Sequence, residues 1–223
     1  GRWNPGIGKV VKEVWANPHS RVYRDLSRDC VVSELTRAKL ISSATHGKQM
    51  LFKFSGHRWL GIHLGMTGSL QIEGSNYQSH KHDALILFQS KQALIFRDPR
   101  QFGRLRMHIG KNAPPWWSEL PVSMLDQRFK PSVLSTALSR HGKRPVKALL
   151  LDQRYFQGMG NWMADEVLWR AHIHPARKCA EISSAEGKKL FTKIKFVVKG
   201  AMHSVGKHGG DPPKGWLFHV RWK

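Results

Sequence analysis

The hydrophobic pattern of this chain changes its period once, and that change limits the folds available to it. Before about residue 110, apolar residues alternate or form short runs between polar turns, as in QMLFKFSG and ALILFQSKQALIFRD. Both patterns are typical of β-strands, and the second predicts a hairpin around the polar tetrapeptide 89–92. Several short strands with turn signals predict a β-sandwich or a barrel.

The second half of the chain has a helical period. Three prolines in GKNAPPWWSELP, residues 110–121, break the strand pattern, and we interpret this stretch as a linker. We expect helices at PSVLSTALSR, at VKALLLDQ after Pro145, at NWMADEVLWRA and at AEGKKLFTKIKFVVKGAMHSV. Asp165 and Glu166 are placed in the first turn of the third helix, where the helix dipole favours acidic residues. Strands followed by helices predict the α+β class.

Net charge narrows the functional classes. Among 223 residues there are 37 Lys and Arg against 15 Asp and Glu, a formal net charge of +22. Self-repulsion of this size destabilises a compact fold, so a polyanionic partner is expected. Nucleic acid is the first candidate and an anionic membrane surface the second; a basic protein without such a partner is the plain alternative. The chain has no run of about 18 apolar residues, so no membrane-spanning helix is expected.

Cysteine and histidine usage gives no metal site. Cys30 and Cys179 are too few for a four-cysteine zinc site, and we expect two thiols in a reducing compartment rather than a disulfide. That compartment would be the cytoplasm, with its nucleoid, or the nucleus. The histidine pairs at 80–82 and 172–174 lack a carboxylate or cysteine at ligand spacing, so we expect no metal bound by them.

The stretch FQGMGNWMADEVLWR places Gly158 and Gly160 directly before a helix. A dinucleotide-binding fingerprint is excluded because Met163 stands where its third glycine would fall, and because a helix precedes the glycines instead of a strand. A tight turn between helices and a phosphate cradle remain. A helix amino terminus offers free N–H groups to an anion, and Asn161 can cap the helix or donate its amide to a phosphate. In so basic a chain we favour the cradle.

Three stretches together resemble the formamidopyrimidine-DNA glycosylase and endonuclease VIII family. They are HLGMTGSL (63–70), DPRQFGRL (98–105) and VKALLLDQRYFQGMGNWMADEVLWRAHIHPAR (146–177), in the family's order and spacing. The resemblance implies an antiparallel β-sandwich over 1–112, a helix–two-turn–helix domain over 122–205, and DNA held in the cleft between them. Residues 206–223 would form a lesion-loop region and the start of a zinc finger.

The resemblance also implies an activity. Family members excise oxidised bases from duplex DNA in base-excision repair and then cleave the strand at the abasic site through an imine. We expect a monomer whose partner is double-stranded DNA with a damaged base or an abasic site, and no membrane.

Single residues receive roles from the same resemblance. Lys48 matches the catalytic lysine of the family's sheet domain. Three residues match those that fill the gap left by an everted base: Met66, Arg100 and Phe102. A flexible apolar side chain, a cationic donor and an insertable ring suit that task, whereas periodicity alone would place Met66 and Phe102 in the core. Matches to DNA-contacting residues are His82, Arg100, Lys143, Lys147, Gly160 and Asn161, the last as the phosphate-binding asparagine.

The sequence departs from the family pattern in three places. Family members begin with proline and glutamate, and the proline amine is the nucleophile; GRWNPGIGKVV instead resembles the family about a dozen positions in, and Pro5 has no free amine. The family's four-cysteine finger would follow FHVRWK, so no cofactor is expected within the chain and a structural zinc only in such a finger. Gln101 stands where arginine is common.

Two explanations of the departures stay open. The sequence is either the inner part of a longer glycosylase or a relative that binds DNA without chemistry. An RNA-binding structural protein also fits the charge, but no motif supports it.

Overall fold

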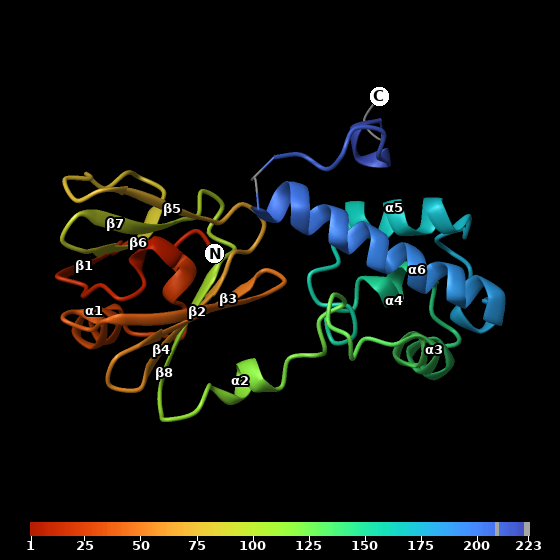
Figure 1. Ribbon diagram of the computed structural model, residues 1–223, viewed down its shortest axis with the longest axis horizontal. Helices are drawn as coiled ribbons and strands as arrows, with labels where there is room; N and C mark the ends of the chain where they lie inside the picture. The colour runs from red at the N-terminus through yellow and green to blue at the C-terminus, as the bar shows by residue number, and fades with distance from the viewer. Residues whose placement is uncertain (208–209, 221–223) are drawn as a thin grey trace. The chain divides into compact units, whose positions relative to one another are not determined.

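The computed structural model describes residues 1–207 and 210–220, and it divides the chain into two compact units, Gly1–Glu119 and Leu120–Lys223 (Figure 1). The first unit contains two antiparallel four-stranded sheets. One sheet has the order β1-β6-β7-β5, with strands Glu13–Ala16, Asp83–Phe88, Gln92–Arg97 and Ser69–Gly74. The other has the order β2-β3-β4-β8, with strands Leu40–His46, Gln49–Phe54, Arg58–His63 and Arg104–Ile109. The β-sandwich is thereby confirmed.

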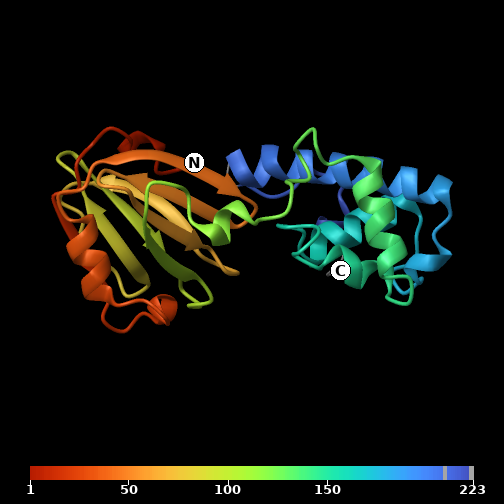
Figure 2. The same ribbon diagram turned by 90° about the horizontal axis from the view of Figure 1, so that it is seen from below.

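The core of the first unit lies between the two sheets. Its large, fully buried side chains include Phe52 and Phe54 of β3 and Phe96 of β7, as strand alternation requires. Trp3 is also fully buried, and its indole N–H donates to the carbonyls of Gln71 and Ile95. Helix α1, Arg28–Leu35, packs against β1 and lies beside the sheets in Figure 2.

The predicted hairpin is present as β6 and β7. The Gln89 N–H donates to the Gln92 carbonyl at 2.8 Å and closes a turn at Ser90 and Lys91. Linker residues contribute to the first unit as well: the short helix α2, Pro115–Ser118, carries Trp116, whose ring lies against Gly61 of β4. A Cβ at Gly61 would come within 2.3 Å of that ring, so the glycine lets the indole lie on the outer face of the sheet.

The second unit is helical. Its helices are α3 (Pro131–Arg140), α4 (Val146–Leu150), α5 (Asn161–Ala171) and α6 (Ser184–Ala201), and all four contribute to one apolar core. The stripe expected on the last helix, Leu190, Ile194, Val197 and Ala201, is buried as predicted. Ser183 begins α6 with a capping box: its hydroxyl accepts from Glu186 N–H, and the Glu186 carboxylate accepts from Ser183 N–H.

One prediction for the third helix is wrong. Asp165 and Glu166 do not lie in its first turn, because α5 begins at Asn161 and its first turn ends before them. Glu166 instead points into the unit and is fully buried.

Short elements complete the described chain. They are η1 (Asn4–Gly6), η2 (Arg21–Tyr23), η3 (Cys179–Glu181), the π-helical η4 (Met202–Lys207) and η5 (Leu217–His219). Within 1–207 and 210–220, no helix combines the length and apolarity needed to cross a bilayer. Cys30 and Cys179 are both free thiols, as expected.

Candidate nucleic-acid interface

One buried carboxylate ties two loops of the first unit together. Asp98, 2% exposed, accepts a hydrogen bond from the Gly103 N–H at 2.6 Å and another from the Thr67 hydroxyl at 3.2 Å. Thr67 belongs to the β4–β5 loop and Gly103 to the β7–β8 loop. The loops also touch directly, since a Cβ at Gly65 would lie 2.5 Å from the Phe102 carbonyl carbon. Gly65 has φ 61°, a backbone conformation that favours glycine, and the close approach of Phe102 leaves no room for a side chain.

These joined loops expose apolar side chains. Met66 is 64% exposed and Phe102 is 50% exposed, so neither is a core residue. The Arg100 guanidinium lies 5.2 Å from the centroid of the Phe102 ring. Exposed apolar groups beside a cation suit contact with a partner that offers both stacked bases and negative charge.

Two further predicted residues lie on segments bonded to the same loops. Lys48 is exposed in the turn between β2 and β3, and its carbonyl accepts from the Leu64 N–H at 3.1 Å. His82 is exposed before β6, and its carbonyl accepts from the Asp98 N–H at 2.9 Å. The structure therefore places the predicted residues of the first unit on connected loops, although they are far apart in sequence.

His63 was not among the predicted site residues. It ends β4 directly before the β4–β5 loop, and its Nδ1 accepts from the Gly65 N–H at 3.1 Å. Burial of the ring, and secondly the positive charges of Lys48 and Arg106, lower the pKa of His63 from its ordinary value, because both disfavour the charged imidazolium. The position of His63 at the head of HLGMTGSL was the available sequence signal.

In the second unit, Gln153 fixes the turn before α5. Its side-chain amide donates to the carbonyls of Leu151 and Met159, and its oxygen accepts from the Gly158 N–H at 2.9 Å. Gly158 has φ 89°, a conformation that strongly favours glycine. This first glycine therefore belongs to the turn itself.

Gly160 has no such structural reason. It caps α5 with φ −106° and ψ 175°, which any residue can adopt, and a Cβ built there would meet nothing within 4 Å. The helix begins with the Ala164 N–H bonded to the Gly160 carbonyl at 2.9 Å. The N–H groups of residues 161–163 donate to no acceptor among the described residues. The exposed Asn161 side chain likewise has no hydrogen bond there, so it is not the cap of this helix.

The two predicted lysines of the second unit differ. Lys143 is exposed before α4. Lys147 is half-buried on α4, and its Nζ lies 2.6 Å from the Asp165 Oδ1 of α5, so it links the two helices around the glycine turn.

The buried carboxylate of Glu166 holds the segment after residue 210. Glu166 forms an ion pair with Arg170, and its Oε2 accepts from the Leu217 N–H at 2.6 Å. The Arg170 guanidinium also lies over the Trp216 ring, 5.4 Å from its centroid. Of the expected lesion-loop stretch KHGGDPPKG, residues 208 and 209 lie outside the described residues.

Within the described part of the chain, no group of three or more His, Cys, Asp or Glu side chains is arranged to hold a metal ion.

Comparison with known proteins gives matches over both units. The family model for the formamidopyrimidine-DNA glycosylase N-terminal domain matches residues 4–105, and the model for the H2TH domain of the same glycosylase matches residues 120–210. A formamidopyrimidine-DNA glycosylase of Thermus thermophilus is 33% identical over 213 residues, which cover 92% of this chain and 73% of that protein. One from Arabidopsis thaliana is 27% identical over 97% of this chain, but the match spans only 59% of its own length.

Solved structures share the fold. The Lactococcus lactis enzyme Fpg (MutM) in complex with Fapy-dG-containing DNA superposes with a TM-score of 0.83 at 23% identity, covering 92% of this chain and 79% of that one. The same enzyme bound non-covalently to DNA containing an AP site gives 0.81 at 24% identity, covering 91% and 77%. The matched chains have a β domain followed by a helical H2TH domain, the same order as the two units described above.

Proposed function

Because this chain belongs to the formamidopyrimidine-DNA glycosylase family, we propose that it binds damaged duplex DNA and acts in base-excision repair as a glycosylase with abasic-site lyase activity. Membership confirms the resemblance first seen in three sequence stretches. The sandwich unit and the helical unit would act as its two DNA-binding domains. The protein would work wherever the cell keeps its DNA.

The observation that carries this proposal is the pair of loops joined by Asp98. They hold Met66 and Phe102 exposed on a backbone that cannot easily shift, because Gly65 packs against Phe102 and the Asp98 carboxylate bonds to both loops. An enzyme that everts a nucleotide needs a rigid apolar wedge to fill the gap. Arg100, beside the Phe102 ring, would donate to the orphaned base.

The second unit would hold the DNA backbone. The free N–H groups at the start of α5, with the Asn161 amide, offer donors and partial positive charge to a phosphate. The absence of a side chain at Gly160 would let that phosphate approach the backbone. Lys143 and Lys147 would add positive charge near the same strand, Lys147 while bonded to Asp165.

Lys48 is the residue we propose for the chemistry. It stands exposed on the turn bonded to the β4–β5 loop, and its ammonium would approach the sugar of an everted nucleotide. In the reaction typical of the family, an amine replaces the base at the sugar C1′ and elimination then breaks the strand. Lys48 would transfer protons in these steps. A structural zinc, common in the family, would be held by a four-cysteine finger if one follows.

Binding to duplex DNA with a tetrahydrofuran abasic-site analogue tests the wedge. Phe102→Ala should weaken binding to this duplex more than binding to an intact one, and should leave the free energy of unfolding nearly unchanged because the ring is exposed. Ile109→Ala, an equally exposed apolar truncation at the end of β8, is the matched control. If Phe102→Ala costs about 3–5 kcal/mol of stability, Phe102 is a core residue and the wedge is rejected.

Borohydride trapping on abasic DNA, with the protein expressed from its complete gene, separates an enzyme from a silent DNA-binding relative. The enzyme is supported if a covalent complex forms and if Lys48→Ala, but not Lys111→Ala, slows its formation. Tight abasic-site binding without any trapped complex would support the silent relative.

A further inference from the structure

The outer face of the second sheet gathers cations that the proposed function does not use. In the register of β4 with β8, His63 lies opposite Arg104 and Gly61 opposite Arg106. Side chains alternate along each strand, so these four residues share one face, while Ile62 and Leu105 between them are buried in the core. Gln49 of β3 lies opposite His63 and extends the same row.

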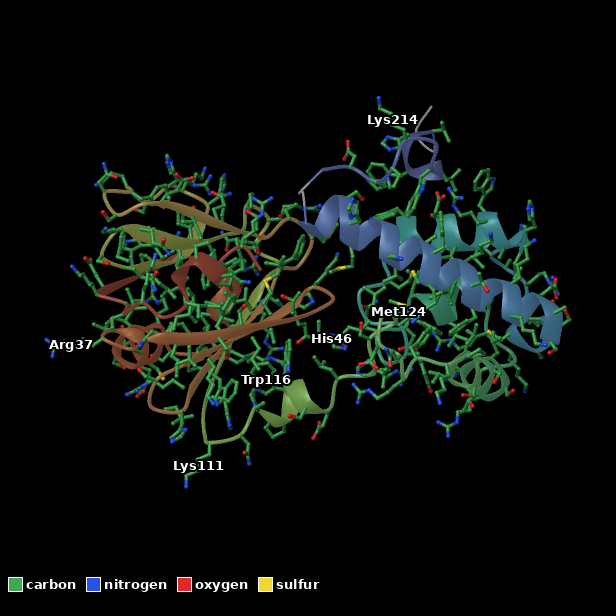
Figure 3. The ribbon with its side chains drawn as sticks, in the orientation of Figure 1. Arg37, His46, Lys111, Trp116, Met124 and Lys214 are labelled. Atoms are coloured by element: carbon green, nitrogen blue, oxygen red, sulfur yellow. The ribbon has the colours of Figure 1, made fainter. Side chains whose placement is uncertain are left out.

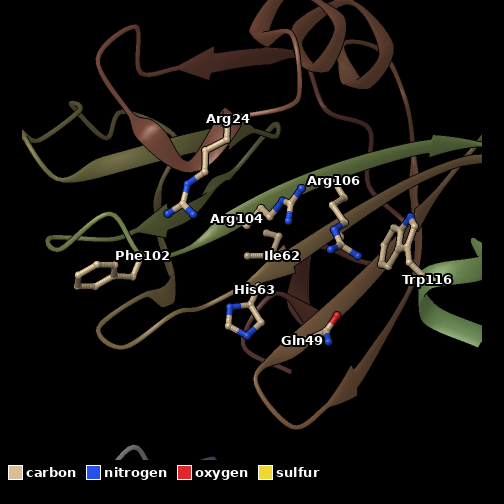
Figure 4. Close-up of a pocket in the computed structure, with 9 residues that line it drawn as sticks. Arg24, Gln49, Ile62, His63, Phe102, Arg104, Arg106 and Trp116 are labelled. Atoms are coloured by element: carbon tan, nitrogen blue, oxygen red, sulfur yellow. The ribbon is translucent and has the colours of Figure 1, made fainter. Parts of the chain in front are cut away.

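This face is hollowed. The residues around it enclose a hollow of about 280 Å³, and they include Arg24, Arg104, Arg106, His63, Phe102 and Trp116 (Figure 4). Phe102, the proposed wedge, lines one end, so the hollow adjoins the joined loops. Because three arginines and a histidine surround it, an anionic group is a better match for this hollow than an apolar ligand.

The arginines are only partly neutralised. Arg104 forms an ion pair with Asp25. Arg24 donates to the carbonyls of Arg21 and Gln101, and Arg106 lies over the Trp116 ring, 5.4 Å from its centroid. Neither has a carboxylate partner among the described residues. Such an arrangement repels itself unless an anion is present, and Arg binds phosphate oxygens with well-matched geometry.

We infer that this hollow binds a phosphate group of DNA through Arg106, Arg104 and Arg24, beside the wedge. The inference rests on the proposed function, because the anion is taken from the same DNA. It adds a contact on the outer face of the β2-β3-β4-β8 sheet to those made by the loops. The phosphate could come from the continuous backbone or from the end of a cut strand.

The test measures how DNA affinity depends on salt. Each phosphate contact contributes about one unit to the slope of log K against log salt. Arg106→Gln and, separately, Arg104→Gln should each lower that slope by about one unit on an abasic-analogue duplex. Arg106→Lys, which keeps the charge, should preserve the slope. Arg37→Asn is the matched control: Arg37 is exposed elsewhere on the first unit (Figure 3), and asparagine tolerates its φ of 65°.

Two DNA substrates identify the source of the phosphate. If the Arg104 and Arg106 variants have a lower salt slope on the continuous duplex, the hollow binds a backbone phosphate. If their slope is lower only on a duplex with a one-nucleotide gap and terminal phosphates, the hollow binds the phosphate of a strand end. If the wild-type protein binds both duplexes and the salt slopes of the Arg104 and Arg106 variants equal that of Arg37→Asn, the inference is overturned and the proposed function stands. If wild type binds neither duplex, both fall. Thermal melting identifies any variant that fails to fold. If Arg106→Gln does not fold, the test is made with Arg104→Gln alone.

Discussion

Asp98 in the sandwich unit and Glu166 in the helical unit do the same structural task in different ways. Each is a buried carboxylate that accepts a hydrogen bond from a distant segment: from the Thr67 hydroxyl for Asp98 and from the Leu217 N–H for Glu166. Glu166 also forms an ion pair with Arg170, whereas no ion pair of Asp98 occurs within the described chain. Asp98 thus accepts hydrogen bonds from neutral donors, whereas Glu166 pairs with a cation that itself packs against aromatic rings.

The two units therefore present different groups to a partner. Around Asp98 the fixed backbone exposes side chains, Met66 and Phe102. Near α5 the exposed groups are backbone N–H groups at a glycine. A side-chain site is broken by truncation, but a backbone site is broken by adding a side chain.

Glu166→Gln should be the most damaging substitution. It leaves the Arg170 guanidinium without its counter-charge among the Trp216, Phe196 and Trp169 rings. Removing the partner of a buried charge costs about 3–5 kcal/mol, and because the Arg170 side chain is 23% exposed we expect a loss at the lower end of that range. Chemical denaturation followed by tryptophan fluorescence measures the loss, and Glu73→Gln, exposed on β5, is the control. An unchanged midpoint would mean that the ion pair does not hold the segment around Leu217.

Asp98→Asn should cost less, about 1–3 kcal/mol, because it weakens hydrogen bonds but strands no cation. The amide keeps one acceptor and places an NH₂ group against the Thr67 hydroxyl or the Gly103 N–H. We also expect weaker binding to abasic-analogue DNA, since the loops carrying Met66 and Phe102 lose their tie. A stability loss equal to that of Glu166→Gln would remove the distinction between the two carboxylates.

Gly160→Ala tests the backbone site without disturbing the fold. The added methyl meets nothing within 4 Å, and the backbone angles suit alanine, so the free energy of unfolding should change by less than about 1 kcal/mol. Duplex DNA binding should nevertheless weaken, because the methyl would occupy the space proposed for the phosphate. Asn161→Ala should weaken binding by about 1–3 kcal/mol for every DNA sequence; Asn112→Ala, also exposed, should not. If Gly160→Ala binds duplex DNA as well as wild type does, Gly160 does not lie against a phosphate.

The smallest effect concerns pH. The folded-state pKa of His63 is lowered, so the unfolded chain binds its proton more readily than the folded chain does. Stability should therefore fall as the pH drops through the ordinary histidine range near 6.5 and below it, and should recover above that range. His63→Gln should flatten this part of the stability profile, measured by denaturation from pH 5 to 8. A profile identical to that of wild type would show that other groups set the pH dependence.

Much of the fold followed from local pattern. The change of period separated the strand-rich unit from the helical unit, although it did not predict the helix α1. The polar tetrapeptide located the β6–β7 hairpin, and the stripe on α6 proved to be core. These features are determined by neighbours in sequence, because side-chain alternation and helical repeat act over a few residues. The three family stretches likewise identified the family without coordinates.

Whether particular side chains are buried or exposed depends on the tertiary structure. Periodicity alone would have buried Met66 and Phe102, but Asp98 and Gly65 hold their loops outward. The predicted helix start at Asn161 is correct, but Glu166 lies beyond the first turn of α5, on the side of the helix that packs into the unit.

The two glycines before α5 looked equivalent in sequence. Only the backbone angles assign Gly158 to the turn and leave Gly160 open. The arginine hollow arises because register pairs Gly61 with Arg106 and His63 with Arg104. Such pairings join residues distant in the chain, and local pattern carries no information about them, because register is fixed only when strands dock against a shared core.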